Sequence, residues 1–154
     1  MNINANRMVN AYGQVQVGSG VATASPHKLI AMLFDGALLS IAQARVHLRI
    51  GDIPVRGKAI SKAIAIIDEG LKISIDLEAG GELAQNLRGL YEYMSHRLLE
   101  ANLKADDAML AEVEGLLKEL KSAWDAIGEV TTHRQAAAQP LNEPPVVASS
   151  YGAV

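Results

Sequence analysis

Apolar residues recur every three or four positions from about residue 26 to residue 128, the spacing of amphipathic helices. Start and stop signals divide this stretch into four helices. Ser25-Pro26 opens the first, which runs over 26–50, and Asp52 and Pro54 open a second that ends near Glu78. "AGGE" at 79–82 precedes a third helix over 82–103, and Asp106 or Asp107 caps a fourth that ends near Gly128.

Short connections between helices of this length favour antiparallel neighbours, so we predict an all-α protein, an elongated antiparallel four-helix bundle. The predicted organisation is an N-terminal arm (1–24), the bundle (25–129) and a disordered tail (130–154) rich in Pro, Ala, Gln and Ser. The Gly- and Ser-rich arm is predicted to be mobile, with a short helical turn between Met8 and Tyr12.

Placing residues at about 100° per position separates the core side of each helix from its surface. The third and fourth helices have one apolar stripe each, as ordinary bundle members do. The inward residues of the third run from Leu83 to Leu98, and those of the fourth run from Met109 through Trp124 to Ile127.

The first two helices carry more apolar residues than one core stripe requires. On the first helix, four apolar residues and a neighbouring glycine lie about 160° from the centre of the core side. On the second helix, four apolar residues and a glycine lie on a face adjoining the core. These extra lines are Met32, Gly36, Leu39, Val46 and Ile50 on the first helix, and Ala59, Ile66, Gly70, Ile73 and Leu77 on the second.

Two interpretations of these lines stay open. Helices in a crowded bundle are buried on more than one side, or are covered by the N-terminal arm. Alternatively, the lines form a groove for a partner, and Gly36 lets a foreign helix backbone approach closely. Gly36 is equally well explained by a close helix contact within the bundle.

Composition and motifs exclude several classes of function. The net charge of −3, with Lys and Arg spread along the chain, is unlike a nucleic-acid-binding protein, and the absence of Cys excludes disulfides and thiolate metal sites. No secretory signal and no uncharged apolar window of membrane-spanning length is found, so we expect a cytoplasmic protein without membrane insertion. Glu92 and His96 are expected to form a solvated ion pair, and no catalytic, cofactor or metal motif is present. We therefore predict a protein that is not an enzyme and has no cofactor.

Three stretches carry a resemblance to a known family. They are "AYGQVQV" (11–17), "TASPHKLIAMLFDGAL" (23–38) and "YEYMSHRLLEANLKADDAMLAEVEGLLKELKSAW" (91–124). The chain resembles the FliS family of cytoplasmic export chaperones over roughly residues 8 to 128. The resemblance implies a bundle that binds the disordered C-terminal segment of flagellin, prevents premature polymerisation and delivers it to the export machinery. It also implies that Tyr12 belongs to an arm that covers part of this surface, whereas Phe34 replaces the tyrosine more usual in the family.

The two lines of reasoning together name a flagellin-binding site. Its residues are Met8, Tyr12, Met32, Gly36, Leu39, Val46, Ile50, Ile66, Gly70 and Ile73. Aspartate at Met32, Leu39 or Ile66 is expected to weaken flagellin binding and leave the fold intact. The alternative function is a self-associating structural bundle. The isolated protein is expected to be a monomer or a weak homodimer.

Overall fold

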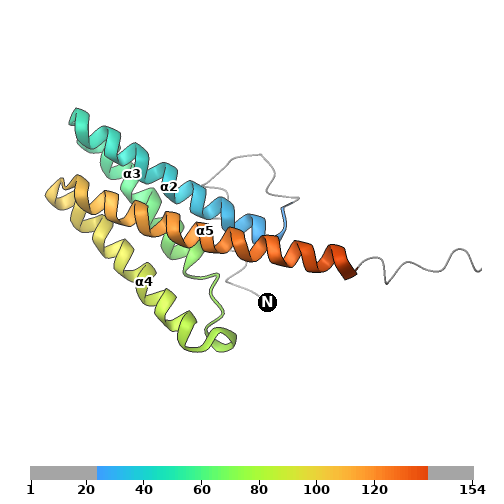
Figure 1. Ribbon diagram of the computed structural model, residues 1–154. Helices are drawn as coiled ribbons and strands as arrows, with labels where there is room; N and C mark the ends of the chain where they lie inside the picture. Colours follow the sequence, from blue (N-terminus) through green and yellow to red (C-terminus); the bar gives the residue numbers. More distant parts are fainter. Residues whose placement is uncertain (1–23, 139–154) are drawn as a thin grey trace, which may run out of the picture. The chain divides into compact units, whose positions relative to one another are not determined.

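The computed structural model describes residues 24–138, and all of its long elements are helices (Figure 1). The elements are α2 (Pro26–Ile50), α3 (Ile53–Ile66), the π-helix η1 (Ile67–Leu71), α4 (Leu77–Lys104) and α5 (Asp107–Ala138). The prediction of an all-α fold with four long helices is confirmed. The N-terminal arm lies outside the described residues. The chain divides into two compact units at Lys121 and Ser122, and the packing below is that of the first unit.

Both ends of α2 follow from the residues that cap it. The Ser25 hydroxyl accepts a hydrogen bond from the backbone N–H of Lys28 at 3.1 Å, and Pro26 occupies the first turn. Gly51 ends the helix in the left-handed region with φ 77°, a conformation that a glycine adopts without strain. The predicted range of 26–50 is confirmed.

The second predicted helix is shorter than expected at its C-terminal end. Asp52 caps α3 as predicted, since its carboxylate accepts a hydrogen bond from the Val55 N–H at 3.2 Å. α3 passes into η1, however, which ends at Leu71, and the predicted end near Glu78 is wrong. The Asp76 carboxylate accepts hydrogen bonds from the N–H groups of Glu78 and Ala79, so it starts a new helix where the apolar spacing suggested continuation.

The glycine pair at 80–81 interrupts helical geometry where the sequence predicted a break before the third helix. α4 spans Leu77–Lys104, against a prediction of 82–103, and only Gly81 is non-helical within it, with φ 57° and ψ −137°. The residues after the kink form the predicted helix from residue 82, and residues 77–80 add a short helical turn before it. At the other end Ala105 adopts the left-handed region, and Asp106 accepts a hydrogen bond from the Ala108 N–H at 2.9 Å, as the predicted cap should.

α5 continues ten residues beyond its predicted end near Gly128, to Ala138. The first residues of the predicted tail, 130–138, are helical, and the rest of the tail lies outside the described residues. No Gly or Pro interrupts residues 129–138, and the run ends in three alanines, the best helix formers. Helix propensity thus extends α5 where the apolar period has already stopped.

Side-chain bridges and packing connect the helices of the first unit in a ring. α2 packs on α3, and α3 and η1 pack on α4. Arg45 of α2 binds Asp107 and Glu114 of α5, and the Arg97 Nε of α4 donates to Glu112 of α5 at 2.7 Å. Each helix therefore has two neighbours, as in a four-helix bundle.

The core of the bundle is aliphatic, as the low aromatic content predicted. Its fully buried large side chains include Leu33, Ile41, Ile60, Ile66, Ile67, Leu71, Met94, Leu98, Leu110, Val113 and Leu117. Leu83 and Ile127 were expected inside but are 77% and 56% exposed. Leu83 lies in the first turn after the non-helical Gly81, where Ala84 is buried instead, and Ile127 belongs to the second unit.

One described helix, α2, is long and apolar enough to cross a membrane by length and composition alone. Half of its most apolar stretch is buried within the protein. Its charged side chains Asp35 and Arg45 form ion pairs with α5, at 2.8 Å to Lys121 and 2.8 Å to Asp107. These are the features of a core helix in a bundle.

Candidate partner-binding surface

An exposed apolar line runs along the outer side of α2. Leu39, Val46 and Ile50 are 57%, 44% and 67% exposed. They are spaced by seven and four residues, which puts them on one face of the helix. These three residues of the predicted apolar line are therefore exposed surface, and their role in binding stays a prediction.

The other predicted site residues do not share this exposure. Met32 and Ile66 are buried, at 7% and 0% exposed, and Gly36 and Gly70 are buried as well. These four positions are therefore not exposed apolar surface, as in the first of the two interpretations, and their part in binding stays a prediction. Ile73 is half-buried, and Met8 and Tyr12 lie outside the described residues.

Gly36 is one of several small residues buried on α2 and α3, two helices that pack on each other. Gly36 and Ser40, one turn apart on α2, are buried, and so are Ala59 and Ala63, one turn apart on α3. His47, on the same side of α2 as Ser40, places its Nδ1 3.8 Å from the carboxylate of Asp52, the α3 cap. Small buried residues on both helices favour a close approach of their backbones, one of the two explanations predicted for Gly36.

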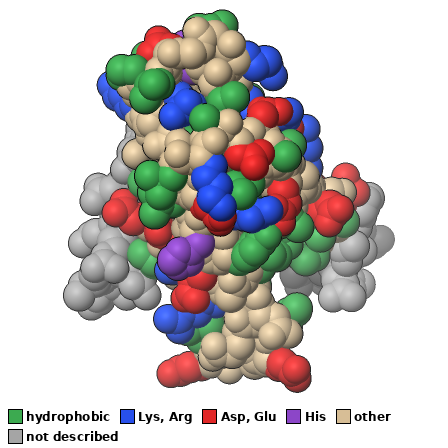
Figure 2. All heavy atoms as spheres, turned by 90° about the vertical axis from the view of Figure 1, so that its left-hand side faces the viewer, with side chains coloured by type: hydrophobic (Ala, Val, Ile, Leu, Met, Phe, Trp, Pro, Cys, Tyr) green, Lys and Arg blue, Asp and Glu red, His purple; other side chains and the backbone are tan. Residues whose placement is uncertain are grey.

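The apolar line continues across the turn between α2 and α3. Ile53 and Val55, in the first turn of α3, are 62% and 42% exposed. Figure 2 shows the end of the protein where this turn lies, at the top of the view, with hydrophobic and charged side chains next to one another. Sequence reasoning missed Ile53 and Val55, although two apolar residues on either side of a first-turn proline were a signal. Residues in the first turn of a helix rarely belong to the protein core, so apolar residues there are expected at the surface.

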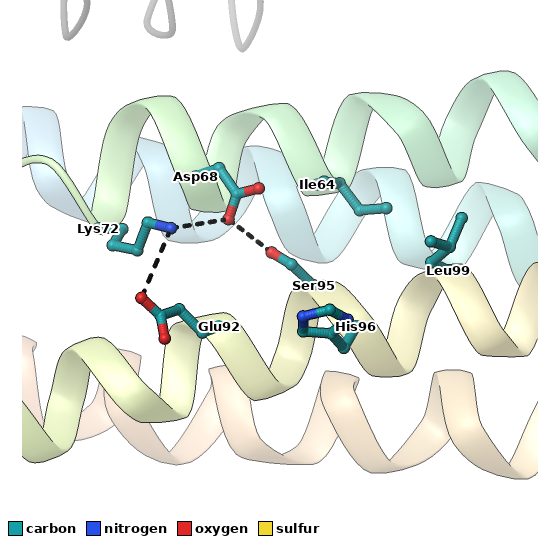
Figure 3. A pocket seen from close by; sticks show the side chains of 7 residues that line it. All are labelled: Ile64, Asp68, Lys72, Glu92, Ser95, His96 and Leu99. Carbon is teal, nitrogen blue, oxygen red and sulfur yellow. Dashed lines mark hydrogen bonds and ion pairs between the residues drawn. The ribbon is translucent and has the colours of Figure 1, made fainter.

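A separate hollow lies between α3, η1 and α4 (Figure 3). Its volume is about 220 Å³, and it is lined by Ile64, Asp68, Lys72, Glu92, Ser95, His96 and Leu99. The Ser95 hydroxyl donates to Asp68 at 2.7 Å, and the Lys72 ammonium lies 3.8 Å from Asp68 and 4.0 Å from Glu92. The polar groups of the hollow thus bind one another and tie η1 to α4.

The predicted ion pair between Glu92 and His96 is wrong. Glu92 instead pairs with Arg88 of the preceding turn at 3.2 Å and with Lys72 of the neighbouring segment. Two cations compete for the carboxylate, and both lie nearer to it than the imidazole does. Among residues 24–138, no group of three or more His, Asp or Glu side chains is arranged to hold a metal ion.

Two carboxylates of α5 accept charged or phenolic partners from neighbouring helices. Asp107 accepts two hydrogen bonds from Arg45, at 2.8 and 2.9 Å, which lower the pKa of its carboxyl group below the ordinary value. Glu112 accepts from the Tyr93 hydroxyl and from Arg97, and these two bonds lower the pKa of Glu112. These bridges fix how α5 lies against α2 and α4 within the first unit.

Arg56 is a buried cation that sequence reasoning missed. Its side chain, 8% exposed, donates through Nε to the Asn102 Oδ1 at 2.9 Å and through Nη2 to the Asn102 carbonyl at 3.2 Å. The carbonyl is one of the last in α4, and it also accepts the backbone N–H of the C-cap Ala105 at 3.4 Å. A lone Arg in the first turn of a helix gives no sequence signal for such a partner 46 residues away.

The relation to known proteins agrees with this architecture. The family model described as flagellar protein FliS matches residues 8–131. The chain belongs to the FliS family. It is 54% identical over 119 residues to the flagellar secretion chaperone FliS of Salmonella typhimurium, a match that covers 77% of this chain and 88% of the relative.

More distant FliS relatives match nearly the same span. The flagellar secretion chaperone FliSB of Pseudomonas aeruginosa is 48% identical over 123 residues, which are 80% of this chain and 97% of the relative. The FliS of Bacillus subtilis is 36% identical over 115 residues, 75% of this chain and 84% of the relative. In this FliS family member Phe34 is 3% exposed, so its ring packs in the core and its position does not require a hydroxyl.

Proposed function

We propose that this FliS family member is a cytoplasmic flagellar secretion chaperone that binds the disordered C-terminal segment of flagellin. Binding prevents premature polymerisation, and the chaperone delivers the segment to the export machinery. The observation that supports this proposal best is the exposed apolar line of α2, in a family whose relatives are named flagellar secretion chaperones. The protein acts by binding, without catalysis or a cofactor.

The mechanism rests on apolar surface that the bundle leaves uncovered. A segment that is disordered when free must bury its own apolar side chains, and Leu39, Val46 and Ile50 offer it a line about 16 Å long, from the 1.5 Å rise per residue. While the segment is bound to the chaperone, it cannot contact other copies of flagellin. Ordering the segment costs several kcal/mol, so binding is moderate and release at the export machinery stays feasible.

Burial divides the proposed site into contacts and support. Leu39, Val46 and Ile50 contact the bound segment directly, whereas Met32, Gly36, Ile66 and Gly70 lie beneath the surface. Ile73, Met8 and Tyr12 remain proposed contacts at the edge of the site. A charge at Ile66, which is 0% exposed, is expected to unfold the bundle, which replaces the earlier expectation that Ile66→Asp leaves the fold intact.

Calorimetry with a synthetic C-terminal flagellin peptide tests the proposal. Leu39→Asp and Val46→Asp should each weaken binding by about tenfold or more, since an interface anchor contributes about 1–2 kcal/mol or more. Both variants should keep the circular dichroism of the unchanged protein. The matched control is Leu83→Asp, an exposed leucine of α4 at 77% exposure, which should bind the peptide normally.

Two results would contradict the proposal. Absence of measurable peptide binding by the unchanged protein removes the function. Normal binding by both Leu39→Asp and Val46→Asp would show that flagellin binds to another face of the protein and not to the apolar line of α2.

A further inference from the structure

The hairpin formed by α2 and α3 is strongly cationic within an acidic protein. Residues 26–66 contain six Lys and Arg against two Asp, a net charge of +4, while the whole chain carries −3, so the remaining residues carry −7. α3 contains no carboxylate at all. The exposed apolar line therefore lies on the positive part of the molecule.

The two carboxylates of the hairpin are already engaged. Asp35 pairs with Lys121 at 2.8 Å, and Asp52 caps α3 and faces His47. By contrast, the Lys58 and Lys62 side chains are exposed, and within residues 24–138 they have no ion-pair or hydrogen-bond partner. Two cations on this surface are thus available to a partner.

Lys58 and Lys62 lie beside the apolar line. α2 and α3 are antiparallel and joined by a turn at Gly51 and Asp52, so residues equally far from the turn are level with each other. Val46 is five residues before Gly51 and Lys58 six after Asp52, while Leu39 is twelve before and Lys62 ten after. The two lysines, one turn apart, therefore flank the stretch from Leu39 to Val46 on the neighbouring helix.

Both lysines point away from the core. They are two residues before and after Ile60, which is 1% exposed, and two residues correspond to about 200° around a helix. A segment that lies on the apolar line meets their ammonium groups at its edge, where the side chains remain solvated. Charges in such a position steer association and set the orientation of the partner.

We propose that the segment bound on this surface is an acidic amphipathic helix. Its apolar side chains cover Leu39, Val46 and Ile50, and carboxylates spaced by four residues lie opposite Lys58 and Lys62. This inference rests on the proposed function and adds the charge of the ligand and its orientation. The favoured orientation is the one that brings the carboxylates to the α3 side.

The test is the binding kinetics of the flagellin C-terminal peptide against the full chain at low and high salt. The double variant Lys58→Glu with Lys62→Glu should lower the association rate by about tenfold and lose most of the salt dependence. The control with the same charge change is Lys104→Glu with Lys118→Glu, because these are exposed lysines of α4 and α5, at 60% and 64%, outside the hairpin. Circular dichroism and thermal unfolding of all variants exclude loss of fold, which is not expected at exposed positions.

A peptide with its Asp and Glu changed to Asn and Gln provides the reciprocal change. It should bind the unchanged protein more weakly by about the same factor, and bind the double variant no more weakly than the original peptide does. Unaltered rates in the double variant, with the original peptide still binding, overturn this inference and leave the proposed function intact. Failure of the original peptide to bind the unchanged protein overturns both.

Discussion

Single residues hold α4 in place against α3, and Arg56 shows how. The guanidinium is buried and has both of its contacts in Asn102. Removal of the Asn102 amide leaves Nε without its acceptor, while Nη2 keeps the backbone carbonyl. Asn102→Ala should lower the free energy of unfolding by about 1–3 kcal/mol, measured by urea denaturation. Lys58→Ala, at an exposed position without a partner among the described residues, should change it by about 0.5 kcal/mol or less. Equal effects of the two changes would contradict a structural role for the Arg56 contact.

The Arg45 bridge to Asp107 predicts a loss of stability in acid. Hydrogen bonding by Arg45 lowers the pKa of Asp107 in the folded protein below its ordinary value of 3.8. The unfolded chain therefore binds the proton first, and the stabilisation is complete above pH 3.8 and lost as the pH falls through the lower folded value. Asp107→Asn should flatten this part of the stability profile, measured by urea denaturation at several pH values. An unchanged acid limb would show that the bridge is not formed in solution.

At the scale of elements, Gly81 and Gly89 of α4 allow the effect of backbone conformation on stability to be distinguished from the effect of helix propensity. Gly81 has φ 57°, a region unfavourable for alanine, so Gly81→Ala should destabilise the protein by about 1–2 kcal/mol. Gly89 is helical, and a Cβ added there meets nothing within 4 Å, so Gly89→Ala should stabilise it by about 1 kcal/mol. Thermal unfolding of both variants measures the difference. Stabilisation by both changes would mean that α4 is straight at residue 81.

At the scale of the whole molecule, the exposed apolar line has two competing uses. If it serves flagellin, the isolated protein is a monomer, and adding the flagellin C-terminal peptide produces a one-to-one complex. If it serves a second copy of the chain, the isolated protein is a dimer, and Leu39→Asp dissociates it. Size-exclusion chromatography with light scattering distinguishes these results. We expect a monomer, and a stable dimer that excludes the peptide would favour the structural alternative.

Local signals in the sequence determined the elements and the family. Ser25, Pro26, Gly51, Asp52 and Asp106 act through residues no more than four positions away, so the ends they specify could be read from the chain. The buried aliphatic stripes followed from the helical period for the same reason. The three stretches that resemble FliS proteins needed no structure either, because they are patterns of residue types.

Only the tertiary structure decided which apolar residues remain at the surface. Met32 and Leu39 lie on one predicted line, yet one is 7% and the other 57% exposed. A helical period gives the direction of a side chain around its own helix. It contains no information on which other parts of the chain cover that side, and this decides which apolar residues are buried. The partner of Arg56 was likewise unpredictable, since it depends on residues far apart in the chain meeting in the folded bundle.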